Sequence, residues 1–196
     1  EMILVYGLYG SGKSYAWATL RKWYEMCGNT EHFHIISTEA ESAERTAEGF
    51  ISGEPGSNFD SNATIHNATD FDTLMEVSKK INESAQPGDW IIIDSVTNPN
   101  EWSRDIYCTE KFGFSWAQFK ASGKQVNEIG PTGWNEIKML YNSWFVPYVV
   151  NFPGHRLGCA REEAIKSDFN REGKASPLND KGETKDKKRI LFVVII

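Results

Sequence analysis

The chain has 196 residues, of which 40% are hydrophobic and 24% are charged, so it is large enough to bury the core of one ordinary domain and too apolar to be disordered. Its formal net charge of −6 excludes a domain that is basic throughout, as strong DNA-binding domains are, and leaves nucleic-acid contact to a local basic patch or an assembly. Cys27, Cys108 and Cys159 are unclustered, which favours a reducing, cytoplasmic setting, and the longest apolar run, 190–196, is too short to span a membrane. We therefore expect a single domain over 1–196 with no membrane segment, cut from a longer chain because strand-like runs stand at both ends.

Strands and helices alternate from the beginning of the sequence. The continuous apolar run 2–6 is typical of a strand buried on both faces. A helix is predicted over 13–26, and a second strand over 33–37. Residues 53–62 are rich in turn formers, and a short strand is predicted over 63–66. The apolar face expected for the helix comprises Ala16, Leu20, Trp23 and Tyr24.

The middle of the chain continues this alternation. Asp70 is a candidate N-cap for the next helix, and the turn residues Pro87 and Gly88 lead into a buried strand over 90–94. The apolar face of that helix comprises Phe71, Leu74, Val77 and Ile81. Residues 98–133 show the least regular pattern, and we interpret them as a possible insertion or DNA-binding loop region.

The last third begins with a helical stripe of aromatic and apolar side chains. Pro147 should end or kink this helix. The stripe comprises Trp134, Ile137, Tyr141, Trp144, Phe145 and Tyr148. A strand over 156–160, a polar loop over 177–188 and a final strand over 190–196 complete the chain.

This order of elements predicts an α/β fold with a mostly parallel sheet flanked by helices on both faces. Ligands of such sheets bind at the carboxyl ends of the strands. The glycine-rich segment 7–14, Glu39 and Asp94 each lie at or just past the end of a predicted strand. We therefore expect all three to meet at one edge of the sheet.

The segment 7–14 has the complete phosphate-binding pattern G-x-x-x-x-G-K-[ST]. Its glycines allow the backbone to surround the phosphates with N–H groups, and the following helix adds the positive end of its dipole. Lys13 is expected to reach the β- and γ-phosphates. The residues that we assign to nucleotide binding here are Gly7, Tyr9, Gly10, Ser11, Gly12, Lys13 and Ser14. A glycine-rich turn that binds nothing is the alternative, which the flanking strand and helix disfavour.

Asp94 ends the apolar strand 90–94, as the aspartate of a Walker B strand does. We assign Ser14 and Asp94 to Mg²⁺, because a P-loop hydroxyl and a Walker B carboxylate hold this ion in P-loop enzymes. The alternative is an aspartate that only caps the next element.

Hydrolysis also needs a group that orients and polarises water. Many ATPases place a glutamate directly after the Walker B aspartate, where this chain has Ser95. Glu39, just past the second strand, is our candidate instead. Its alternative role is that of a solvated glutamate at a helix start, since Glu41 and Glu44 lie close by.

With Lys13, Glu39 and the Asp94–Ser95 pair in these positions, the chain resembles the RecA-like ATPases over residues 2–96. Its size and the segment 159–162 are most similar to the RecA-type nucleotide-binding proteins of phages and prophages. The resemblance implies ATP with Mg²⁺, a homo-oligomer, and single-stranded DNA as a partner in recombination, annealing or replication. ATP in place of GTP follows from this likeness and from the lack of an Asn-Lys-x-Asp motif.

The same resemblance implies further site residues in the second half of the chain. A polar sensor is expected at the end of the strand between the P-loop and Walker B strands, which makes Arg161 or Glu162 the candidate. Basic residues that reach a neighbouring subunit's site often precede a late strand. Lys185, Lys187, Lys188 and Arg189 stand there, with Lys187 and Arg189 as our leading candidates, and a solvated basic hairpin is the equal alternative.

Residues 111–124 interleave aromatic side chains with lysines, a pattern that can stack single-stranded bases. The favoured alternative is a small helical insertion with its rings packed inward. His32 and His34 share a strand face, but no further ligand has metal-binding spacing. Three other functions stay open: a P-loop kinase, for which we see no arginine-rich lid, a nucleotide-controlled assembly switch, and a phage packaging motor, which Ser95 disfavours.

Overall fold

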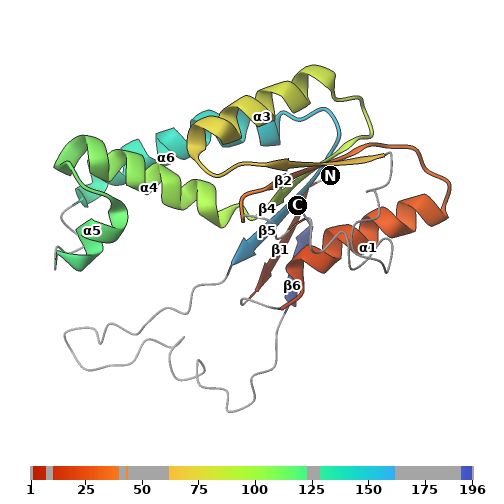
Figure 1. The fold of residues 1–196 in the computed structure, drawn as a ribbon, viewed down its shortest axis with the longest axis horizontal. Coiled ribbons are helices and arrows are strands. Elements are labelled where there is room, and N and C mark those ends of the chain that lie inside the picture. The colour runs from red at the N-terminus through yellow and green to blue at the C-terminus, as the bar shows by residue number, and fades with distance from the viewer. Residues whose placement is uncertain are drawn as a thin grey trace, which may run out of the picture.

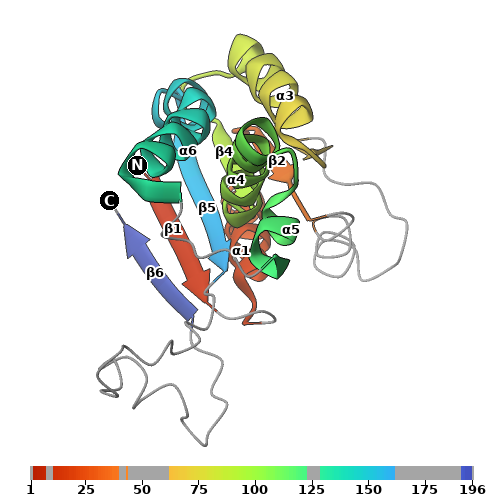
Figure 2. The same ribbon diagram turned by 90° about the vertical axis from the view of Figure 1, so that its left-hand side faces the viewer.

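The computed structural model describes residues 2–7, 11–39, 43, 62–122, 129–161 and 191–195. They form one sheet with the strand order β3-β2-β4-β5-β1-β6 (Figures 1 and 2). The first five of these strands are parallel to their neighbours, and β6 is antiparallel to β1. The strands are β1 (Met2–Gly7), β2 (Phe33–Ser37), β3 (Ala63–Asn67), β4 (Trp90–Asp94), β5 (His155–Arg161) and β6 (Leu191–Ile195).

Helices cover both faces of this sheet (Figure 1). One face carries α1 (Lys13–Met26), and the other carries α3 (Phe71–Ser84), α4 (Thr97–Phe112) and α6 (Gly130–Phe145). The short α5 (Trp116–Ala121) packs on α4. The predicted α/β class, with a mostly parallel sheet between two helical layers, is confirmed.

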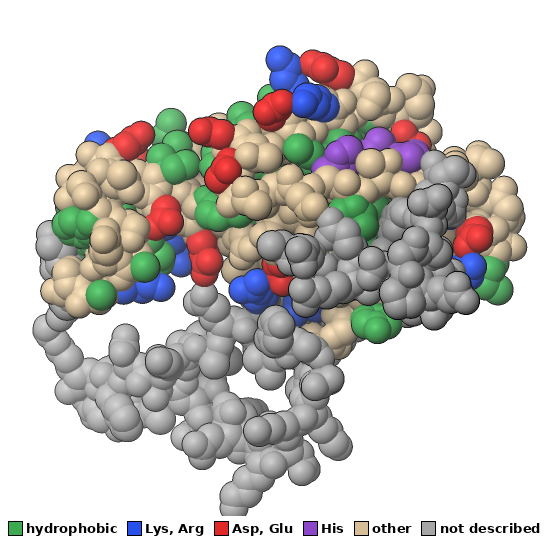
Figure 3. Space-filling view, in the orientation of Figure 1, with side chains coloured by type: hydrophobic (Ala, Val, Ile, Leu, Met, Phe, Trp, Pro, Cys, Tyr) green, Lys and Arg blue, Asp and Glu red, His purple; other side chains and the backbone are tan. Residues whose placement is uncertain are grey.

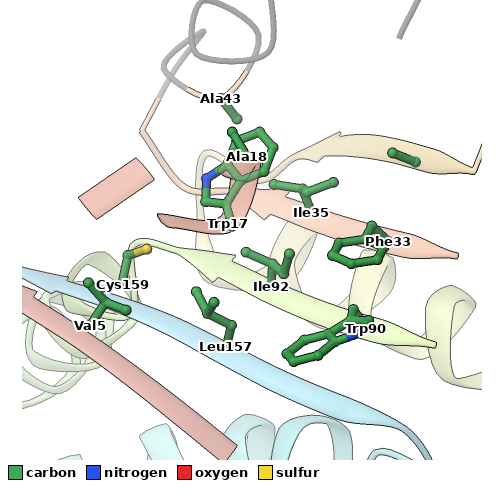
Figure 4. Packing of buried hydrophobic residues seen from close by; sticks show 11 residues of the cluster. Val5, Trp17, Ala18, Phe33, Ile35, Ala43, Trp90, Ile92, Leu157 and Cys159 are labelled. Atoms are coloured by element: carbon green, nitrogen blue, oxygen red, sulfur yellow. The ribbon is translucent and has the colours of Figure 1, made fainter. Parts of the chain in front are cut away.

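The core beneath α1 centres on Trp17 and Ala18, which pack in one cluster with Ile35 of β2, Ile92 of β4 and Leu157 of β5 (Figure 4). The predicted apolar face of α1 is only partly right. Ala16, Leu20 and Tyr24 are partly buried, whereas Trp23 is 56% exposed. The most buried stripe of this helix runs instead through Lys13, Trp17, Ala18 and Arg21. Because Lys13 and Arg21 are charged, this stripe does not look apolar in the sequence. The Arg21 guanidinium lies 5.3 Å from the centre of the Phe33 ring.

The opposite face is built around Trp144 of α6, which is fully buried against α3 and the strands. Its indole Nε1–H donates to the Ser78 hydroxyl at 2.8 Å. As predicted, Asp70 caps α3 by accepting from the Thr73 backbone N–H at 2.7 Å. The α-helix also ends before Pro147, and the chain continues as the π-helix η2 (Val146–Val150).

Residues 97–121 form two helices whose aromatic rings pack inward. Phe119 is fully buried and Trp116 is 7% exposed, with Phe112 and Phe114 against them. The inward-packed helical alternative therefore describes this region. None of the helices in the described part of the chain is long and apolar enough to cross a membrane.

Candidate functional site

The carboxyl ends of four parallel strands bring the predicted site residues together. Ser37 of β2 pairs with Asp94 of β4, and Asp94 pairs with Cys159 of β5. Gly7 of β1 pairs with Arg161 of β5. The strand β5 thus lies between the strand that precedes the phosphate-binding motif and the strand that ends in Asp94.

The described part of the phosphate-binding motif has the geometry of an anion site. Gly12 has φ of +90°, a conformation that favours glycine, and it precedes α1, whose first turn receives no side-chain cap. The ammonium of Lys13 is buried and donates to the Gly7 carbonyl at 3.1 Å. The Ser11 hydroxyl is buried and has no hydrogen-bond partner among the described residues. A buried cation beside an uncapped helix start is suited to a phosphate.

Asp94 is buried at the end of β4, and helix α1 supplies two donors to it. The Trp17 indole Nε1–H donates to Asp94 Oδ2 at 3.1 Å, and the Ser14 hydroxyl also hydrogen-bonds to this carboxyl. Burial raises the pKa of Asp94, and the charge of Glu39 acts in the same direction; both hydrogen bonds and the charge of Lys13 oppose the rise. Carboxylate and hydroxyl oxygens are hard ligands, so Ser14 and Asp94 fit Mg²⁺.

A hydrogen-bond network fixes the segment between β2 and Glu39. The Thr38 hydroxyl donates to the Ser95 carbonyl at 2.7 Å and accepts from the Ser95 backbone N–H at 2.8 Å. The Asn98 side-chain amide donates to the Thr38 carbonyl at 2.7 Å. The Ser37 hydroxyl donates to the Glu39 carbonyl at 3.0 Å. These contacts hold the backbone of Glu39 beside the end of β4.

The side chain of Glu39 forms an ion pair with Arg161. Both Nε and Nη2 of Arg161 lie 2.8 Å from Glu39 Oε1, and the Arg161 and Glu39 side chains are 35% and 19% exposed. The Arg161 backbone N–H donates to the Thr97 hydroxyl at 2.9 Å, which anchors the end of β5 to the start of α4. The two candidates from distant parts of the sequence are therefore in direct contact.

Sequence reasoning missed four residues that shape this site: Trp17, Thr38, Thr97 and Asn98. Trp17 gave a signal in its spacing, because it lies four positions after Lys13 and therefore on the same face of a helix. The hydroxyl and amide side chains gave none, because each bonds to backbone atoms that only the fold brings near.

Histidine side chains gather on one part of the surface, as the purple atoms of Figure 3 show, and His32, His34 and His66 lie together at β2 and β3. The rings of His32 and His34 have centroids 4.6 Å apart, and the ring centroid of His66 lies 6.0 Å from that of His34. Burial lowers the pKa of His34 to about 4, and the charges of its two neighbours add to this effect. Among the described residues, no group of three or more histidine, cysteine or acidic side chains is arranged to hold a metal ion.

Several predicted residues lie outside the described ranges. These are Tyr9, Gly10, Glu162, Lys185, Lys187, Lys188 and Arg189, together with the loop at 177–188 and all but the last residue of the loop at 53–62. The sequence matches no protein-family model and no curated protein. A functional conclusion therefore depends on the motif and on the geometry of the sheet edge.

Proposed function

We propose that this protein binds ATP with Mg²⁺ and hydrolyses it in the manner of the RecA-like ATPases. The observation that carries the proposal is the convergence of Lys13, Asp94 and Glu39 at the carboxyl edge of one parallel sheet. The position of β5 also supports it, because the resemblance implies a polar sensor on a strand between the P-loop and Walker B strands, and Arg161 ends that strand.

Each residue has a distinct task in this proposal. Lys13 and the start of α1 bind the phosphates, where a fixed cation stabilises charge that develops on the transferred group. Ser14 and Asp94 hold Mg²⁺, which neutralises phosphate charge and orients the leaving group when it is bound. Glu39 accepts a proton from the attacking water. Arg161 fixes the orientation of Glu39 through their ion pair.

We further propose, from the resemblance, that the protein works as a homo-oligomer on single-stranded DNA. Trp116 and Phe119 are buried, so these two rings are not available to stack on the bases of such a strand. If cations make the main contacts with the phosphates, DNA binding should weaken steeply as salt rises.

The test is ATP hydrolysis by the purified protein, with and without single-stranded DNA, beside Lys13→Ala and Glu39→Gln. Lys13→Ala should weaken nucleotide binding and lower turnover by roughly 10²–10³-fold. Glu39→Gln should bind nucleotide normally and lose about 10²–10⁴-fold in turnover. Lys22→Ala and Glu83→Gln are matched controls on exposed helix positions and should behave as wild type.

Each other outcome has a definite meaning. Normal turnover by Glu39→Gln would remove the RecA-like assignment. An unchanged rate with DNA would remove the DNA partner and leave the ATPase. Phosphate transfer to an added acceptor would show a kinase, and nucleotide-dependent oligomerisation without turnover would show an assembly switch.

A further inference from the structure

The two fully buried tryptophans of the described chain use their indole N–H groups differently. Trp144 donates to a neutral partner, the Ser78 hydroxyl, on the face covered by α3. Trp17 donates to the carboxylate of Asp94 at 3.1 Å, on the face covered by α1. A buried indole N–H usually finds an acceptor, although that of Trp90 has none among the described residues, and nothing in packing alone requires the acceptor of Trp17 to be a carboxylate at the edge of the site.

The ring of Trp17 is fixed by its surroundings (Figure 4). It packs in the cluster that holds Ile35, Ile92 and Cys159, from three neighbouring strands. A ring that is enclosed on all sides cannot turn its N–H elsewhere without opening the core. The donor therefore has one direction, which is set by the core and points to Asp94 Oδ2.

Asp94 is held from two elements at once. Ser14 and Trp17 approach it from the first turns of α1, and the Cys159 thiol hydrogen-bonds to it from β5. Cys159 Sγ also lies 3.6 Å from the Lys13 carbonyl oxygen, which links β5 to the start of α1. Of the three groups that hydrogen-bond to Asp94, only the indole belongs to a rigid ring, and an indole can donate but never accept.

We propose that Trp17 is a positioning residue for the magnesium site, because its indole N–H fixes one oxygen of Asp94 and so presets the oxygen that meets the ion. The inference rests on the proposed function. A neutral donor is suited to this task, since it orients a carboxylate without cancelling the charge that attracts a cation, as a lysine or arginine in its place would.

The experiment compares Trp17→Phe with Trp144→Phe. Each substitution keeps an aromatic ring in the core and removes one buried N–H donor, so each should lower the unfolding temperature. The quantity measured is the Mg²⁺ concentration that gives half-maximal ADP binding in calorimetry. Trp17→Phe should raise this concentration about 10–100-fold, the usual effect of losing a partner of a metal ligand, and Trp144→Phe should leave it within about twofold.

A double-mutant cycle separates an effect through Asp94 from a general loosening. In an Asp94→Asn background, Trp17→Phe should cause no additional change in Mg²⁺ dependence. ADP binding in the presence of a chelator should be the same for wild type and Trp17→Phe. Equal Mg²⁺ shifts in the two single tryptophan variants, or no shift in either, would overturn the role of Trp17.

A measurement on the wild type covers the case in which Trp17→Phe does not fold. With ADP present, the indole ¹H–¹⁵N signal of Trp17 should move when Mg²⁺ is added, and that of Trp144 should stay in place. An unmoved Trp17 signal in a protein that binds Mg²⁺ with ADP would overturn the inference. Wild-type protein that shows no Mg²⁺-dependent nucleotide binding would instead refute the proposed function.

Discussion

The two ends of strand β4 carry buried carboxylates with different partners. Asp89, before the strand, accepts from the His32 backbone N–H at 2.9 Å and from the Gln86 backbone N–H at 2.7 Å. Asp94, at the other end, accepts from side chains of α1. The backbone donors to Asp89 tie two loops together, whereas the donors to Asp94 are side chains that meet beside the phosphate-binding motif. We therefore expect the amino end of the sheet to serve stability and the carboxyl end to serve function.

The largest expected effect is the loss of hydrolysis on substitution of Asp94, at the carboxyl end of β4. Asp94→Asn keeps the size of the side chain and one acceptor oxygen but removes the charge, so hydrolysis should fall by roughly 10²–10³-fold. Stability should change in the opposite direction. Because burial raises the pKa of Asp94 in the folded protein, its ionisation at neutral pH opposes folding, and an amide removes that cost. Hydrolysis rates and urea unfolding at pH 7 measure the two effects. If Asp94→Asn lowered both activity and stability, the proposed difference between the two ends of β4 would be contradicted.

The next effect concerns the stability of the folded protein in acid and the side chain of His34, near the amino end of β2. The pKa of His34 is about 4 in the folded protein, against 6.5 for an unperturbed histidine. The unfolded chain therefore binds a proton first, and stability present above pH 6.5 should be lost as the pH falls toward 4. The loss should be about 2 kcal/mol, because solvent screens part of the effect at this incompletely buried ring. The lowered pKa of His66 acts in the same direction.

Urea unfolding at pH 7 and at pH 4.5 measures this loss. The groups around His34 are His32, His66 and Asp89, and Asp89 alone favours its charged form. His34→Gln should flatten the dependence while leaving nucleotide binding at neutral pH unchanged. An equally steep dependence in that variant would assign the effect to another group.

An effect of similar size, on stability alone, is expected at Asp89. Asp89→Asn keeps one acceptor oxygen for two backbone N–H groups, so one of the two is left facing an amide N–H₂. The cost should be about 1–3 kcal/mol in the free energy of unfolding. ATP hydrolysis at a temperature where the variant is folded should match the wild type, and a selective loss of activity would break the division between the two ends.

The smallest effect sets the baseline. Lys80 and Glu76 form an ion pair on α3 with both side chains about two-thirds exposed. Water and salt screen such a pair, so Lys80→Ala should change neither the unfolding midpoint nor the hydrolysis rate beyond experimental error. A measurable change in either quantity would mean that the exposed surface of α3 also contributes to stability or activity.

Sequence patterns predicted the strands and helices well where the signal is local. The bounds of α1, β2 and β4 follow from apolar runs and the phosphate-binding motif, and all three were predicted residue for residue. A small helical insertion with inward-packed rings was the favoured interpretation of 111–124, but the bounds of the helices within 97–121 were not predicted, because polar residues interrupt their periodicity.

The candidate site divides in the same way. Lys13, Ser14 and Asp94 belong to local motifs and were found. The ion pair between Glu39 and Arg161 joins residues 122 positions apart, and the contact of Trp17 with Asp94 joins residues 77 positions apart. No pattern in a single sequence encodes such pairings. The expectation that β2 and β5 end at the same edge of the sheet places Glu39 and Arg161 near each other, but it does not predict their ion pair.

The place of β1 in the sheet has a consequence for a nascent chain. Strands β3 and β4 both pair with β2, but among the described strands β1 pairs only with β5 and β6, whose residues follow it by roughly 150 positions or more. At ribosomal speeds of about 5–20 residues per second, β1 waits on the order of 10–30 s for a partner. Among the described parallel strands, β1 can therefore dock only once β5 has emerged. Under the proposed function, a ribosome-bound chain would bind nucleotide only after that point.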